Sequence, residues 1–148
     1  MATKVFKTAV QAMEDIKAVI EMADVITNTS LTGELRIMNR RLNSDKEDIV
    51  INTIVASAEQ ITEGYFNLNT HVPNLKNQVA ANPTATDTTQ PNIARMNEIG
   101  SVLMEVIDDY RGFDFILQLD SGGEVIPDGK NWYFNFKVKY TYLRRDKN

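Results

Sequence analysis

His71 is the chain's single histidine, and it lies in the stretch GYFNLNTHVPN at residues 64–74. Imidazole is the commonest general base in enzymes, so this residue is the first candidate for chemistry. A nucleophilic site also needs a serine, threonine or lysine beside the base, with a third group to orient that base. No G-x-S-x-G or S-x-x-K sequence accompanies His71. We therefore predict no catalytic residues and expect His71 to be a surface or interface side chain.

Two pairs of carboxylates, Glu47-Asp48 and Asp108-Asp109, are the second candidate, because paired carboxylates can do acid–base work. The first pair falls at the start of a predicted strand and the second at the end of a predicted helix, where solvated charge is ordinary. The chain has no cysteine, which excludes disulfides and thiolate ligands, and one histidine excludes a histidine-rich metal site within one chain. We predict no metal and no cofactor.

Aromatic and basic residues mix in NWYFNFKVKYTYLRR at residues 131–145, a composition that also occurs in nucleic-acid-binding surfaces. The aromatic residues lie at period two, as the core residues of a strand should. The net charge is −4, and residues 130–148 contain six basic residues and one acidic residue, which leaves −9 for residues 1–129. This distribution can orient identical subunits head to tail, or it can describe a solvated basic tail.

The length and composition indicate one globular domain. The chain has 148 residues, of which 43% are hydrophobic and 24% charged, close to the values of soluble proteins. No apolar run approaches the roughly 20 residues that span a bilayer. Glu14 and Asp15 interrupt the segment where a signal peptide would have its apolar region. We expect no membrane association, and a protein used in a cytosol or in a particle assembled there.

Apolar residues at three- and four-residue steps predict two amphipathic helices. The first covers about residues 4–25. The second begins after Pro91, which suits the first turn of a helix, carries an apolar stripe from Ile93 to Tyr110, and ends at residues 111–112.

Strands are predicted at about 48–56, 64–72, 113–119 and 130–145, with an optional short strand within 33–38. The fold class is therefore α+β: an antiparallel sheet of four to five strands with two helices packed on one face, in the order α-β-β-(β)-α-β-β. In the strand 64–72, Asn67, Asn69 and His71 alternate with Phe66, Leu68 and Thr70, so the first three share a polar face that meets water or another subunit.

Residues 75–90, LKNQVAANPTATDTTQ, have no apolar period and are rich in small and polar residues. Such a long connection within a compact domain is either mobile or functional. We predict a flexible loop or arm that orders on a partner.

This set of features resembles the tail-terminator, or tail-completion, proteins of long-tailed bacteriophages. Those proteins have an N-terminal helix, a β-hairpin of the kind that DIVINTI and GYFNLNTHVPN would form, a second helix and a final pair of strands. The element order matches over nearly the whole chain, although the segment 75–90 is longer than the typical family connection. The stretch EDIVINTIVASAEQITEGYFNLNTHVPNLKN is also similar to small tail or neck proteins encoded in phages and prophages of Bacteroidetes-like hosts.

The resemblance implies a structural virion protein, not an enzyme. It implies a hexameric ring that caps the tail tube at the head–tail junction, ends tube polymerisation and docks to the head connector, after assembly in the host cytoplasm. The expected partners are further copies of the chain, the tail-tube protein and the neck proteins, with DNA passing through the lumen without sequence-specific binding. Asn67, Asn69, His71, Arg144 and Arg145 are the candidate interface residues. The alternatives are another neck protein, a tail-tube subunit, a host cytosolic binding domain or an unrecognised hydrolase.

Overall fold

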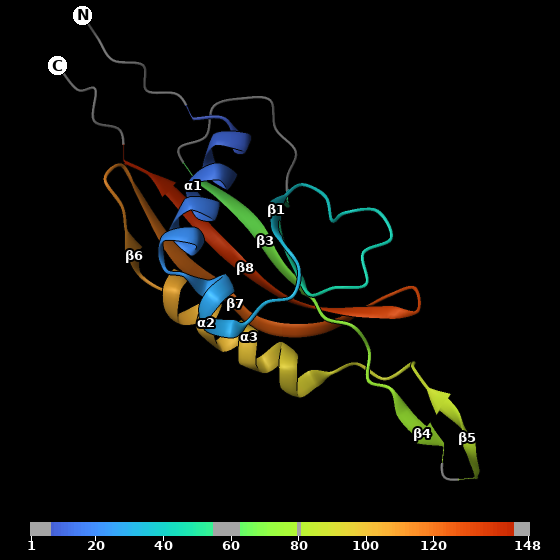
Figure 1. Cartoon of the computed structure of the whole chain (residues 1–148). Coiled ribbons are helices and arrows are strands. Elements are labelled where there is room, and N and C mark those ends of the chain that lie inside the picture. Colours follow the sequence, from blue (N-terminus) through green and yellow to red (C-terminus); the bar gives the residue numbers. More distant parts are fainter. Residues whose placement is uncertain (1–6, 55–62, 80, 144–148) are drawn as a thin grey trace, which may run out of the picture.

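The computed structural model describes residues 7–54, 63–79 and 81–143 and shows a mixed α+β protein (Figure 1). Within these residues the helices are α1 (Ala9–Met22), α2 (Val25–Thr29) and α3 (Ile93–Ile107). The strands are β1 (Leu35–Ile37), β2 (Asp48–Thr53), β3 (Glu63–His71), β4 (Asn77–Val79), β5 (Asn82–Asp87), β6 (Tyr110–Arg111), β7 (Phe115–Asp128) and β8 (Asn131–Tyr142).

Six strands form one sheet in the order β1-β2-β3-β8-β7-β6, and β4 pairs with β5 in a separate hairpin. The predicted antiparallel pairing of β2 with β3 is confirmed. The predicted antiparallel sheet of four to five strands is confirmed in part, since the described residues form six strands, of which β1 lies parallel to β2 and the short β6 adds an edge strand. The connection over residues 38–47 returns the chain to its starting end before β2 begins, which makes that pair parallel.

The N-terminal helix predicted for residues 4–25 is two helices in the described part of the chain. Thr8 caps α1 through a capping box with Gln11. The chain then turns at Ala23 and Asp24, where Asp24 has a left-handed backbone with φ of 53°. An α-helix cannot continue through such a residue, so α2 starts again at Val25. Two expected helices therefore become three.

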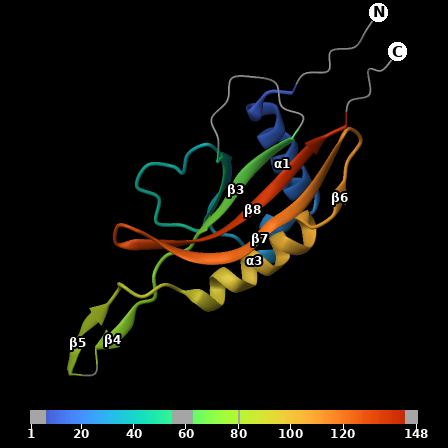
Figure 2. The same ribbon diagram turned by 180° about the vertical axis from the view of Figure 1, so that it is seen from behind.

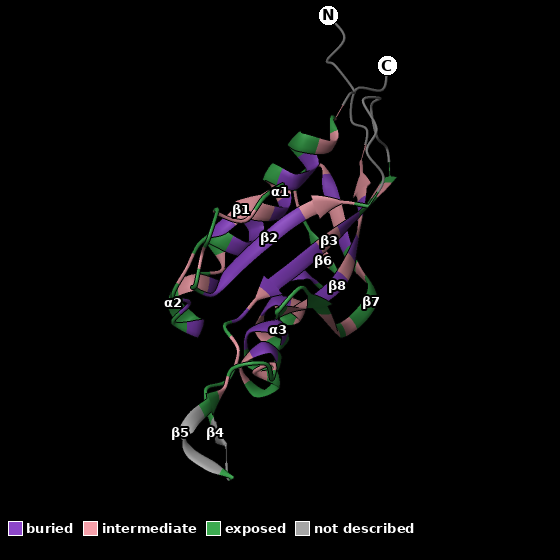
Figure 3. Ribbon diagram, turned by 90° about the vertical axis from the view of Figure 1, so that its right-hand side faces the viewer, coloured by how far each residue is buried: buried purple, intermediate pink, exposed green. Residues whose placement is uncertain are grey.

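All three helices cover the same face of the sheet, as predicted, and the opposite view leaves the strands in front (Figure 2). Helix α1 packs against β1 and β2, while α3 packs against β3, β7 and β8. Burial concentrates on the central strands and the inner sides of the helices (Figure 3). At Gly100 of α3, an added Cβ would lie 2.3 Å from the Phe134 ring, so only glycine allows this close approach.

Strand β7 is longer than the strand predicted at about residues 113–119. The strand instead continues to Asp128 and pairs with β8 throughout. The register shifts between Leu119 and Ser121 and again between Ser121 and Glu124, where Gly123 has φ of 72°. The long hairpin therefore has two bulges, and Gly122 and Gly123 lie in the second.

The β4–β5 hairpin occupies residues 77–87 and projects away from the sheet (Figures 1 and 2). The segment 75–90, predicted as a loop, thus contains antiparallel strands with a bulge at Val79. At its base, the Leu75 amide donates to the Gln90 carbonyl over 2.9 Å. Its mobility in the isolated subunit stays a prediction.

Candidate interface on the outer face of the sheet

The predicted alternation along β3 is confirmed. Phe66, Leu68 and Thr70 are buried beneath the helices. Asn67, Asn69 and His71 point to the face without helices, where they meet side chains of β2 and β8.

Asparagine side chains from three neighbouring strands form a hydrogen-bonded row across this outer face. Asn67 Nδ2 donates to Asn52 Oδ1 of β2 over 2.9 Å. From β8, Asn135 Nδ2 donates to Asn67 Oδ1 over 3.1 Å and to Asn69 Oδ1 over 2.6 Å. Because Asn69 and Asn135 are largely buried, these bonds offset the cost of removing the amides from water. The row is a polar, hydrogen-bonded cluster, and at one side Lys137 Nζ donates to Asn135 Oδ1 over 3.4 Å.

Sequence reasoning missed Asn52 and Asn135 as members of this row. Period two along residues 130–145 already puts Asn135 on the face opposite Phe134 and Phe136. The missing information was the register, in which Asn67 lies opposite Asn52 and Asn69 opposite Asn135.

His71 lies at the end of the row and contacts the ring of Tyr133, with ring centroids 5.2 Å apart. Its Nδ1 atom is buried without a hydrogen-bond partner in the described part of the chain. Burial lowers the pKa of His71 below its ordinary value, and the charge of Arg40 lowers it further. The imidazole is therefore neutral near pH 7, and it packs as an aromatic side chain.

The pair Glu47-Asp48, expected to be solvated, is buried instead. Ser44 Oγ and Arg40 Nε donate to Asp48 Oδ2 over 2.5 and 2.8 Å, and the Glu34 amide donates to Asp48 Oδ1 over 2.9 Å. Burial alone would raise the pKa of Asp48, but these hydrogen bonds and the charge of Arg40 lower it to about 2. Asp48 is thus a structural anion that holds the loop 38–47.

Glu47 has a different partner, Arg95 of α3. Arg95 Nε and Nη2 donate to its two carboxylate oxygens over 2.6 and 2.8 Å. The hydrogen bonds from Arg95 lower the pKa of Glu47 below its usual range. This two-pronged ion pair joins α3 to the start of β2.

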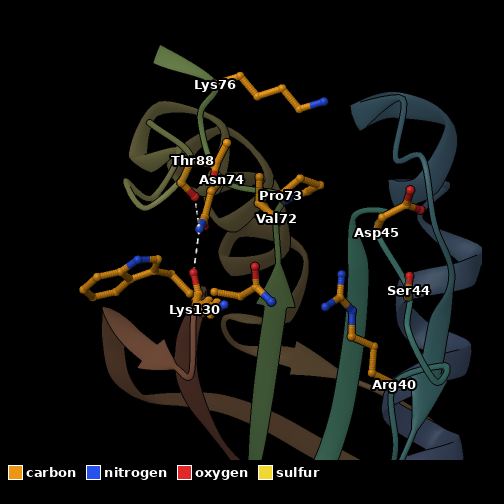
Figure 4. A pocket seen from close by; sticks show the side chains of 11 residues that line it. Arg40, Ser44, Asp45, Val72, Pro73, Asn74, Lys76, Thr88 and Lys130 are labelled. Atoms are coloured by element: carbon orange, nitrogen blue, oxygen red, sulfur yellow. Dashed lines mark hydrogen bonds between the residues drawn. The ribbon is translucent and has the colours of Figure 1, made fainter. Parts of the chain in front are cut away.

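A cleft of about 380 Å³ adjoins the His71 end of β3. Arg40, Ser44 and Asp45 line one side and Lys130 the other, with Lys76 beyond the segment Val72–Asn74 (Figure 4). Asn131 and Trp132, at the start of β8, complete the lining.

The walls of the cleft are tied together by side-chain hydrogen bonds. Asn74 Nδ2 donates to the carbonyls of Thr88 and Lys130, both over 2.7 Å (Figure 4). Trp132 Nε1 donates to the Thr89 carbonyl over 3.0 Å. These bonds fix the base of the β4–β5 hairpin against the β7–β8 turn, which gives the cleft a defined shape.

The remaining predicted interface residues, Arg144 and Arg145, lie outside the described residues. Within the described part of the chain, no group of three or more histidine, cysteine, aspartate or glutamate side chains is arranged to hold a metal ion. No helix there is long and apolar enough to cross a membrane.

Comparisons with known proteins leave the family of this chain open. No protein-family model matches it, and no curated protein matches it. A crystal structure of a protein from Akkermansia muciniphila is similar over 99% of this chain and 83% of the other, with a TM-score of 0.37 and 8% sequence identity.

Proposed function

We propose that this protein is a structural subunit of a long-tailed bacteriophage and that its copies form a ring at the head-proximal end of the tail. The resemblance to tail terminators implies that the ring is a hexamer. The ring ends polymerisation of the tail tube and docks to the head connector. DNA passes through its lumen without sequence-specific contacts. The protein is not an enzyme in this proposal.

The observation that supports the proposal most is the projecting β4–β5 hairpin. Its pairing partners lie within the hairpin itself, while Asn74 and Trp132 fix its base to the body. An arm that is rigid at its base and leaves the body is suited to contact a neighbouring subunit, because less ordering entropy is lost on binding. The partly exposed Asn52 and Asn67 of the asparagine row offer a second surface for such contact.

Sedimentation velocity and negative-stain electron microscopy of the full chain, alone and with tail-tube protein, test the proposal. We expect closed rings, and tubes of limited length once the protein is added. A chain that stays monomeric in both conditions and leaves tube length unchanged would refute it.

A matched variant separates the arm from the body. Replacing residues 77–87 by a short glycine–serine turn should leave urea unfolding of the body nearly unchanged and should abolish ring formation. Limited proteolysis provides a second measurement, since we expect cleavage between Asn77 and Gln90 in the monomer and protection after assembly. Rings formed by the truncated chain would remove the arm from the proposal.

A second candidate, a cytosolic binding domain of the host, is favoured by the cleft at Lys76 and Lys130. Another neck protein or a tail-tube subunit would also form a ring. Gold labelling of isolated tails distinguishes these proteins from a terminator, because it shows where along the tail the protein lies.

A further inference from the structure

The cleft beside the β4–β5 hairpin carries lysines without ion-pair partners in the described residues. Arg40 is paired with Asp48 and Arg95 with Glu47, so these charges largely cancel. Lys76 and Lys130 line the cleft, and Lys46 lines an adjoining one that shares Asp45, Val72, Pro73 and Asn74. Three exposed lysines therefore line the two clefts, and of the two lining carboxylates, Asp45 and Glu47, the second is already paired with Arg95.

Among the described residues, acidic side chains gather at the end of helix α3. Helix α3 begins after its cap Asn92, which lines the adjoining cleft. It runs along the sheet to β6, at the end away from the β7–β8 turn (Figures 1 and 2). Glu105, Asp108 and Asp109 are exposed at this far end. The nearest ion pair is Asp109 with Arg111 at 4.0 Å, and both side chains are about 70% exposed, so it is too weak to cancel the cluster.

We propose that the cleft binds the acidic end of α3 from a second copy of this chain. The occupant is the corner formed by Glu105, Asp108 and Asp109, and the contacting groups of the cleft are Lys46, Lys76 and Lys130. This inference rests on the proposed function, since it specifies one contact of the proposed ring.

The geometry suits this occupant because the two surfaces differ and lie at opposite ends. A contact between different surfaces of identical chains leaves both a free donor and a free acceptor surface, so it repeats, and it gives a ring when the rotation between neighbours closes. The Asn74 and Trp132 hydrogen bonds hold the cleft in shape before the partner arrives, and opposite charges steer the encounter.

Charge reversal on each side tests the contact. Lys76→Glu with Lys130→Glu makes the cleft acidic, and Asp108→Lys with Asp109→Lys makes the far end basic. We expect each double variant to raise the concentration for half-assembly by about tenfold or more at low salt. An equimolar mixture of the two should assemble, because each reversed surface then finds an opposite charge on the other variant.

The fourfold variant that carries both reversals is the decisive control, because its net charge equals that of the wild type. We expect its concentration for half-assembly to return to within about threefold of the wild-type value. Glu14→Lys with Glu21→Lys, on the exposed side of α1, matches the charge change of the far-end variant and should leave assembly unchanged. Urea unfolding of every variant verifies that the chains are folded.

The outcomes separate this inference from the proposed function. Rings from the wild type and from both double variants would overturn the cleft contact and leave the ring in place. Loss of binding to a short DNA duplex in the Lys76→Glu, Lys130→Glu variant, with assembly unchanged, would also overturn it, since the occupant would then be phosphate. An oligomer of another kind that both variants abolish and the fourfold variant restores would support the contact, although the terminator function would fall.

Discussion

Replacing Asp48 by asparagine removes the charge that holds the loop beside the cleft. The Asp48 side chain is fully buried, and it accepts hydrogen bonds from Ser44, Arg40 and the Glu34 amide. Asparagine has nearly the same shape, so the substitution leaves little cavity. It leaves Arg40 without its carboxylate, which is the costly part of breaking a buried pair.

The lowered pKa of Asp48 gives the size of the expected loss in unfolding free energy. The difference between 3.8 and about 2, multiplied by 1.36 kcal/mol per pH unit, gives about 2.4 kcal/mol of stabilisation at pH 7. Because the pKa is lower in the folded state, this stabilisation is complete above the unfolded pKa of 3.8 and is lost as the pH falls toward about 2. The loss in Asp48→Asn should therefore be about 2.4 kcal/mol at pH 7 and roughly half of that at pH 3.

Urea unfolding, followed by the fluorescence of the single tryptophan, Trp132, measures this free energy at both pH values. Asp45→Asn is the matched control, because Asp45 is exposed in the same loop. This substitution should change the free energy of unfolding by no more than about 0.5 kcal/mol. Equal stability of wild type and Asp48→Asn at pH 7, or a difference that does not shrink at pH 3, would show that Asp48 does not stabilise the fold as an anion.

Three further substitutions test other parts of the molecule. His71→Ala should lower the free energy of unfolding by less than about 1 kcal/mol at pH 7.5. The stability of this variant should fall less than that of the wild type as the pH drops through 6.5, because the pKa of His71 is lowered in the folded state. Parallel pH profiles of the two proteins would contradict this. Gly100→Ala should destabilise by about 1 to 3 kcal/mol despite its better helix propensity, since the new Cβ meets Phe134; a stabilised variant in thermal unfolding would refute the close contact. Arg144→Glu with Arg145→Glu should weaken assembly in light scattering at low salt and less at high salt, and a salt-independent result would assign these arginines to simple surface.

Local patterns were sufficient for the parts of the fold that depend on one segment. The alternation in residues 64–72 predicted the two faces of β3, and the apolar stripe after Pro91 predicted the buried positions Met96, Ile99 and Leu103 of α3. These features follow from periodicity alone.

Features that depend on distant partners could not be predicted from the sequence. Glu47 can be buried because Arg95, 48 positions later in the chain, donates hydrogen bonds to its carboxylate. No local sequence pattern predicts that pairing. The parallel β1–β2 pair depends on the path of residues 38–47. The break at Asp24 depends on one backbone angle, which aspartate tolerates but does not specify. The sequence of residues 75–90 has no apolar period, and strand prediction relies on such a period.

The bulges of β7 have a consequence for how copies of this chain can join. Beyond Leu117, where pairing with β6 ends, the outer edge of β7 has no strand partner in the described residues. An unpaired edge of this length is a template for cross-β growth, in which main-chain ladders extend without limit. The register shifts between Leu119 and Glu124 interrupt the ladder at mid-strand. In the proposed ring, self-association would therefore rest on side-chain contacts, and these are all used when the ring closes.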